Sequence, residues 1–244
     1  MFTIETYPSH WVKGLIVMCK YSFEDVRKLY NEMELTKGKD AYRYVPEVFE
    51  KIEDPYKEDY LKRNPGPRQS ASQSWIRFKG KAFEHLLQYI ITDSIEELGL
   101  KVVNGDELGG AQLKTLKDNV IINYGEFKPL LPDADIVIYN PENSEVIAIL
   151  SSKVSLRERI THTGYWKFKF LESQRTEHIR LYLITLDRDR HLTRRERPNK
   201  QRVIAETDLD GTYVLTTEEL EESDKVKLFE HFIEDLKQVI GENQ

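Results

Sequence analysis

The sequence predicts an α/β fold in which a central mixed β-sheet is flanked by helices. Two β-rich runs, Asp135–Tyr139 and Glu145–Lys153, surround a Pro/Asn/Ser turn, and this pattern is typical of a hairpin. Trp75–Leu98 carries its apolar residues with helical periodicity. Ile179–Leu186 is apolar enough to be a buried strand. Strands that alternate with helices in this way favour a sheet covered by helices.

The N-terminal region is expected to be helical and polar. Ser22 is a good N-cap for one helix, and Pro46–Lys62 is expected to form a second. Asn64–Pro67 contains two prolines and a glycine, and small polar residues follow as far as Ser74. This is the best boundary in the chain. It predicts an N-terminal helical subdomain over residues 1–66 and a main domain over residues 67–244.

The remaining elements follow in order after the helix Trp75–Leu98. We expect a short strand and turn, a strand, the hairpin, a helix, a buried strand, one or two further strands and a C-terminal helix. Apart from the hairpin and the buried strand, they are placed at Lys101–Gly110, Val120–Tyr124, Ser155–Ser173, Arg202–Leu215 and from Thr217 onward.

Composition limits the classes of function. The chain has 244 residues, of which 39% are hydrophobic, and this is enough to bury one good core with a small appended subdomain. A net charge of −6 argues against a surface coated in positive charge, but it leaves room for a local basic face. The apolar runs are too short to span a bilayer. Met1–Cys19 lacks the features of a secretory signal, and the single cysteine fits a reducing cytoplasm, so we expect a cytoplasmic protein without a membrane partner.

The hairpin brings chemically active residues together. Residues two apart share one face of a strand, so Asp133 pairs with Asp135, and Ser151 pairs with Lys153. Folding about Asn143 places the two pairs side by side. Two carboxylates beside a lysine suit a hard divalent cation, with the lysine orienting or activating a water molecule. Hydrolysis of a phosphodiester requires these parts.

These residues resemble a known family. Pro132-Asp133-Ala134-Asp135, followed by strand, turn, strand and Ser151-Ser152-Lys153, looks like the core of the PD-(D/E)xK nucleases. The continuation Lys153–Arg159 resembles the K-x3-R-(D/E)-R motif of type II restriction endonucleases that read CCGG or CCNGG, and it is most similar to the BsaWI group. The order of elements agrees over about residues 75–205, whereas the motif match is limited to residues 132–159.

The resemblance implies a restriction-endonuclease-like sheet and a catalytic domain that depends on Mg²⁺. In this family serine often replaces the acid before the lysine, and an earlier helix supplies a glutamate, which would be Glu84 here. Asp135 and Glu84 would bind the metal, and Asp133 is the alternative to Asp135. We favour Asp135 because it directly precedes the strand. A second glutamate is expected 13 or 14 residues past the lysine, where this chain has Trp166 and Lys167, and the nearest later acid is Glu172.

The resemblance also implies double-stranded DNA as the partner. Arg157 and Arg159 can bind guanine, and Glu158 can accept a hydrogen bond from cytosine N4. A palindromic site is read by matching halves, so we expect a homodimer that needs no small-molecule cofactor, and further assembly stays open. Between Leu186 and Arg202 the chain carries seven basic residues against three acids, a net charge of +4. The arginines expected to contact DNA here are Arg188, Arg190, Arg194 and Arg195.

Structural interpretations compete with each of these assignments. The aspartates could belong to a turn, Glu84 could be a solvated residue paired with Lys81 or His85, and the arginines could lie on an exposed face. At the level of function, the alternatives are a repair or structure-selective nuclease, a DNA-binding protein with an inactive nuclease fold, and an interaction protein that uses its N-terminal helices.

Overall fold

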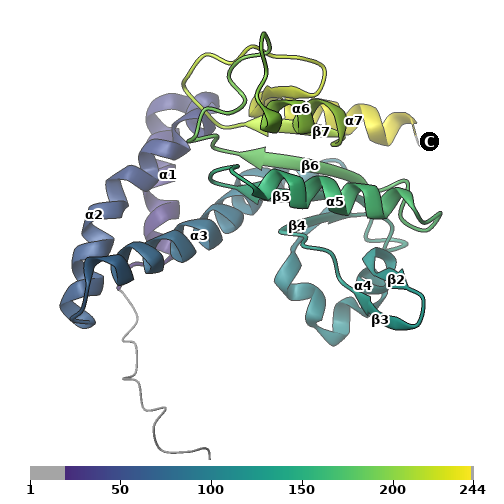
Figure 1. Ribbon diagram of the computed structural model, residues 1–244, viewed down its shortest axis with the longest axis horizontal. Helices are drawn as coiled ribbons and strands as arrows, with labels where there is room; N and C mark the ends of the chain where they lie inside the picture. Colours follow the sequence, from purple (N-terminus) through teal and green to yellow (C-terminus); the bar gives the residue numbers. More distant parts are fainter. Residues whose placement is uncertain (1–19, 243–244) are drawn as a thin grey trace, which may run out of the picture.

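The computed structural model of the protein describes residues 20–242 (Figure 1). The expectations about Met1–Cys19 therefore lie outside the described residues. The main sheet has six strands in the order β1-β4-β5-β6-β7-β8, and β2 and β3 form a separate two-stranded sheet. The strands are β1 Lys101–Asn104, β2 Ile122–Tyr124, β3 Phe127–Leu130, β4 Ile136–Tyr139, β5 Val146–Lys153, β6 Arg180–Thr185, β7 Gly211–Val214 and β8 Val226–Leu228.

The main sheet is mixed, as predicted. β1, β4 and β5 pair antiparallel, whereas β5, β6, β7 and β8 pair parallel. The predicted hairpin is β4–β5, in which Ile136 lies opposite Leu150. In the next pair Lys153 lies beside Thr185. Because parallel strands end at the same edge of a sheet, the segments that follow β5, β6 and β7 meet there.

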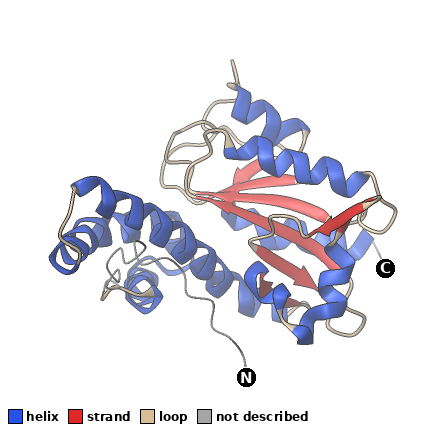
Figure 2. Cartoon of the chain, turned by 60° about the horizontal axis from the view of Figure 1, so that its bottom comes forward, coloured by secondary structure: helices blue, strands red, loops and turns tan. Residues whose placement is uncertain are grey.

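Helices cover both faces of this sheet (Figures 1 and 2). Ile136 and Ile138 pack into a cluster with α3 and α7, while Val137 packs into a second cluster with α4 and α5. This alternation is the period of two that a strand imposes. The helices are α1 Phe23–Lys37, α2 Val45–Arg63, α3 Arg68–Glu96, α4 Lys114–Val120, α5 Arg159–Leu171, α6 Lys200–Thr207 and α7 Phe232–Glu242, with 3₁₀ turns η1 Gly38–Tyr44, η2 Gly105–Gly109, η3 Ala111–Leu113 and η4 Phe229–His231.

The N-terminal helices share a core with the sheet. The predicted cap is present, since the backbone N–H of Ser22 donates to the Asp25 carboxylate at 2.8 Å and α1 begins at the next residue. α1, α2 and the first half of α3 lie to one side of the sheet (Figure 2). One apolar cluster nevertheless runs from Val26 in α1 through α3 to Leu236 in α7. The long helix α3 therefore connects the two parts of the molecule.

Several predicted elements were wrong in detail. The small polar residues before Trp75 are helical, because α3 begins at Arg68. Most of Val120–Tyr124 is strand β2, but Val120 ends α4. The predicted strand at Arg202 is helix α6, which Asn199 caps by accepting the Arg202 N–H at 3.0 Å. No helix starts at Thr217. Its neighbours bind other segments instead, as Glu221 accepts the Arg195 N–H at 2.6 Å, and the last helix begins at Phe232.

No helix within residues 20–242 combines the length and the apolar character needed to cross a bilayer.

Candidate active site

Asp135 and Lys153 are in direct contact at the start of β4 and the end of β5. The Lys153 Nζ donates to Asp135 Oδ2 at 2.8 Å, and the backbone N–H of Ser152 donates to the same oxygen at 2.6 Å. Only 9% of Asp135 is exposed, and 12% of the Lys153 side chain. Asp135 directly precedes β4 and its N–H donates to the Leu150 carbonyl of β5 at 3.2 Å, so the sheet holds the geometry of the pair.

Gly105 supports Asp135 from behind, and the sequence analysis did not identify it. Its N–H donates to the Asp135 carbonyl at 3.0 Å. A Cβ atom at Gly105 would lie 1.6 Å from the carbonyl oxygen of Ala134. Any side chain here would displace the backbone that carries Asp135, so the close approach requires glycine.

Asp133 lies at the mouth of the site. Half of its side chain is exposed, and Oδ2 lies 3.9 Å from the Lys153 Nζ. Its other neighbour is His162 on α5, whose Nδ1 is 3.6 Å away. No local spacing in the sequence indicates the position of His162 beside the aspartate.

Glu84 approaches from α3. Its carboxylate forms an ion pair with Lys81 at 2.7 Å, which is one of the alternatives left open by the sequence. Burial raises the pKa of Glu84, the hydrogen bond from Lys81 opposes this shift, and the negative charge of Asp135 adds to it. Two carboxylates therefore act on each other within a site that is largely shielded from water.

These residues enclose a cavity of about 350 Å³, called the site cavity below. Its lining comprises Gly80, Glu84, Asp133, Asp135, Ser152, Lys153, Val154, Arg159 and His162. Residues 20–242 contain no group of three or more histidine, cysteine or acidic side chains arranged to hold a metal ion. Mg²⁺ is often bound through only one or two carboxylates together with water and substrate phosphates, so Asp135 and Glu84 fit this ion.

No further acid from α5 lines the site cavity. Trp166 and Lys167 are buried, and Lys167 forms an ion pair with Asp210 at 2.7 Å. Glu172 follows the last residue of α5 and binds Lys169 at 2.6 Å. Ser151 points toward the same helix, with its hydroxyl 3.2 Å from that of Thr163. The glutamate expected downstream of the lysine thus has no counterpart in this cavity.

Arg157, Glu158 and Arg159 form an exposed turn just before and at the first residue of α5, called the Arg-Glu-Arg turn below. The helix begins four residues later than predicted, so two of the three residues lie outside it. Arg157 has a φ of +38°, a backbone conformation that is unfavourable for residues other than glycine. Gln201 on α6 donates to the Arg157 carbonyl at 3.3 Å. A neighbouring helix therefore helps to hold the turn.

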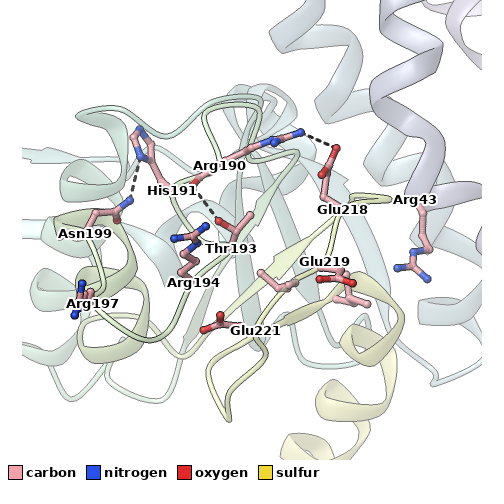
Figure 3. Close-up of a pocket in the computed structure, with 12 residues that line it drawn as sticks. Arg43, Arg190, His191, Thr193, Arg194, Arg197, Asn199, Glu218, Glu219 and Glu221 are labelled. Atoms are coloured by element: carbon pink, nitrogen blue, oxygen red, sulfur yellow. Dashed lines mark hydrogen bonds and ion pairs between the residues drawn. The ribbon is translucent and has the colours of Figure 1, made fainter.

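Residues 187–199, called the arginine-rich loop below, extend from the same edge of the sheet. Arg188 binds Glu50 of α2 at 3.2 Å, and Arg190 binds Glu218 at 2.8 Å (Figure 3). Arg194 and Arg195 are exposed, and in the described part of the chain their guanidinium groups form no ion pair within 4.0 Å. The loop therefore divides into arginines that form ion pairs and arginines that are free to bind an anion.

Buried polar groups give the arginine-rich loop a fixed shape. The Asp187 carboxylate accepts the N–H groups of His191 and Leu192 at 2.9 and 2.8 Å. Burial raises the pKa of Asp187, and these two hydrogen bonds oppose the shift. Arg202, one of the seven basic residues counted in this stretch, is fully buried and donates to the carbonyls of Leu192 and Glu221, so it supports the loop from inside.

Comparisons with known proteins agree on one group. A sequence model of the family described as "BsaWI restriction endonuclease type 2" matches residues 112–235. MjaVIP of Methanocaldococcus jannaschii, assigned as a type II restriction enzyme, is 34% identical over 212 residues, which cover 80% of this chain and 93% of the relative. HpyAORF263P of Helicobacter pylori, assigned likewise, is 32% identical over 147 residues, which cover 57% of this chain and 76% of the relative.

The fold is similar to that of a solved structure. Restriction endonuclease PspGI, solved with its substrate DNA, superposes with a TM-score of 0.51 at 14% sequence identity. The superposition covers 89% of this chain and 93% of PspGI. At this level of identity the likeness concerns the fold alone, and it agrees with the mixed sheet and flanking helices described above.

Proposed function

Since the chain belongs to the BsaWI family of type II restriction endonucleases, which are DNA-cleaving hydrolases, we propose that it cuts double-stranded DNA at a palindromic site containing CCGG, with Mg²⁺ as cofactor. The observation that carries this proposal is the continuity of the site. The contact between Lys153 and Asp135 opens into the same cavity as Glu84, and the Arg-Glu-Arg turn begins four residues beyond the lysine. Chemistry and base reading would thus share one edge of the sheet.

Asp135 and Glu84 would hold the metal ion. When bound, Mg²⁺ would supply positive charge to the scissile phosphate as negative charge develops there. The raised pKa of Glu84 beside Asp135 supports this assignment, because two acids in a half-buried cavity need a compensating charge.

Lys153 would position the attacking water. Its Nζ is fixed by Asp135 on one side and lies 3.9 Å from Asp133 on the other. An ammonium held in this way can donate to a water or to a phosphate oxygen without moving. Asp133, at the cavity mouth, would act from a more exposed position.

Arg157, Glu158 and Arg159 would read the bases. All three side chains are exposed, as contact with a major groove requires. Two copies of the chain would read the two halves of the palindrome, so the active form would be a homodimer. Arg188, Arg190, Arg194 and Arg195 would contribute contacts to phosphates. Residues 67–244 would form the catalytic domain, and residues 1–66 an N-terminal helical subdomain.

The test is digestion of a sequenced plasmid by the purified protein, with Mg²⁺ and with EDTA, followed by sequencing of the fragment ends. Discrete ends that depend on Mg²⁺ and share a palindrome containing CCGG are the expected result. Ends at another palindrome would overturn the proposed specificity alone. Random ends would indicate a repair or structure-selective nuclease, and an intact plasmid under both conditions would indicate a DNA-binding protein that does not cleave.

A further inference from the structure

A second cavity lies beside the site cavity. It has a volume of about 340 Å³ and lies between α2, α3 and the Arg-Glu-Arg turn. Gly80, Val154 and Arg159 line both cavities. The two spaces are therefore neighbours, and α3 forms a wall that is common to both.

The second cavity carries an excess of positive charge. Two acids line it, Glu53 and Asp189, together with five basic residues, Lys57, Lys79, Arg157, Arg159 and Arg188. Glu53 is already bound to Lys57 at 2.5 Å and lies 4.0 Å from Arg188. Within residues 20–242, the charged groups of Lys79, Arg157 and Arg159 form no ion pair within 4.0 Å. These three cations face the cavity without a carboxylate of their own.

Lys79 is the most constrained of the three. It is half-buried, and its Nζ lies 5.7 Å from the centre of the Trp75 ring. Burial lowers the pKa of Lys79 and the nearby charge of Arg188 lowers it further, while the charges of Glu53 and Asp189 oppose part of this shift. A half-buried ammonium without an ion-pair partner is destabilising for the folded chain. A bound anion would supply the missing partner.

The position of Gly80 in α3 provides a second argument for a ligand at this cavity, and this argument does not depend on charge. It lies in the interior of a 29-residue helix, a position that disfavours glycine relative to alanine. A Cβ atom at Gly80 would have no atom within 4 Å, so packing does not require its absence. Glycine here leaves bare helix backbone on the wall between the two cavities, where a large ligand can approach closely.

We propose that Lys79 and Gly80 form a channel for the sugar-phosphate backbone of the DNA strand that is cut. The channel would hold the phosphates between the scissile bond, at Glu84, and the bases, at the Arg-Glu-Arg turn. Ser72 lines the second cavity and Glu84 lines the site cavity, and the two residues are about 18 Å apart along the axis of α3. This distance equals roughly five nucleotide steps at 3.4 Å per step. The inference rests on the proposed function, because it presumes a DNA substrate.

The first test concerns charge. Lys79→Ala should weaken binding of a CCGG duplex and of an unrelated duplex alike, by about tenfold, because a phosphate contact carries no sequence information. The dependence of log K on log salt should become shallower by about 0.9, the value for one lost phosphate contact. Lys79→Arg should restore most of the affinity. Lys28→Ala is the matched control, since Lys28 is exposed on α1 and lines neither cavity.

The second test concerns space. Gly80→Ala and Gly80→Gln should raise the melting temperature by roughly 2–4 °C, because both residues favour the helix more than glycine does. Gly80→Gln should nevertheless reduce cleavage at least tenfold, because its side chain would fill the channel. Gly241→Ala in α7, another helical glycine with no atom near its Cβ position, should leave cleavage unchanged. A merely structural role for Gly80 predicts no such division between stability and activity.

The outcomes separate the two proposals. An unchanged salt dependence in Lys79→Ala, or cleavage by Gly80→Gln at the parent rate, would overturn the channel and leave the endonuclease intact. A parent protein that neither binds nor cuts DNA would overturn both.

Discussion

The site cavity and the arginine-rich loop lie at the same edge of the sheet, but they are built differently. In the site cavity, Lys153 ends β5 and Asp135 directly precedes its partner strand β4, and the two side chains contact each other directly. In the loop, Asp187 and Arg202 hold the backbone while the free arginine side chains extend outward. In the site cavity the side-chain atoms themselves are fixed, whereas in the arginine-rich loop only the backbone is fixed. We therefore expect substitutions in the cavity to change the rate of cleavage and those in the loop to change binding.

Lys153→Ala should give the largest effect. Losing the ammonium that we propose positions the attacking water should slow cleavage by about 100- to 10,000-fold, the range found for groups that assist proton transfer. Binding of DNA should survive, because the Arg-Glu-Arg turn is untouched. Single-turnover cleavage with Mg²⁺ and equilibrium binding without it measure the two effects separately. Full activity in this variant would show that Lys153 has no catalytic role.

The two aspartates offer a sharper comparison within the cavity. Asp135→Asn should slow cleavage by roughly 100- to 1,000-fold, because the buried carboxylate is the partner of Lys153 and a proposed metal ligand. Asp133→Asn should slow it less than about tenfold, because half of that side chain is in solvent. The same single-turnover assay compares both variants. If Asp133→Asn proved the more damaging, the roles assigned to the two residues would be reversed.

Glu158→Ala tests the turn that lies between the two regions. Loss of a base contact should slow cleavage at the preferred site by about 5- to 150-fold, equivalent to about 1–3 kcal/mol, and should relax discrimination at one base pair. Parallel rates on the preferred duplex and on singly substituted duplexes measure this. An equal loss on every duplex would mean that Glu158 supports structure and does not read bases.

Arg194→Ala tests the loop itself. Loss of one phosphate contact should weaken binding to all duplexes by several-fold and reduce the salt dependence by about 0.9. Arg175→Ala is the matched control, since this exposed arginine precedes β6 at the opposite edge of the sheet. Titrations at several salt concentrations measure both variants. A loss confined to one DNA sequence would instead assign base reading to Arg194.

Glu84→Gln should change the melting temperature only slightly, which is the smallest effect predicted here, and the sign of that change tests the raised pKa of Glu84. Because the folded chain raises the pKa of Glu84, the ionised carboxylate destabilises the fold above that pKa, and this penalty disappears once the pH falls below the pKa of the unfolded chain. The variant should therefore melt slightly higher than the parent at neutral pH and equally in acid, while losing cleavage. Melting curves across this pH range measure the difference, and Glu142→Gln in the exposed hairpin turn is the control.

Local patterns explain which parts could be predicted. The hairpin was predicted because strand periodicity and a turn sequence lie next to each other in the chain. The acidic run from Glu218 to Glu222 was interpreted as the start of a helix, but Glu221 binds the backbone of Arg195, 26 residues earlier. Such partners are fixed by tertiary packing and leave no local signal.

The same reason accounts for the missed site residues. His162 lies in a helix that sequence periodicity detects, but its contact with Asp133 depends on how α5 crosses the sheet. Gly105 follows a short strand and resembles any turn glycine until Ala134 is placed against it. By contrast, Asp135 and Lys153 could be paired beforehand, because hairpin geometry alone brings them together.

The hydrogen bond from Gln201 to the Arg157 carbonyl has a consequence for protein engineering. A graft of residues 155–159 into a relative would transfer the side chains that we propose face the bases. It would not transfer the donor that supports Arg157 in its left-handed conformation. The transplantable unit of specificity therefore includes α6 as well as the turn, and libraries that vary only the turn would sample side chains on a backbone that has lost its support.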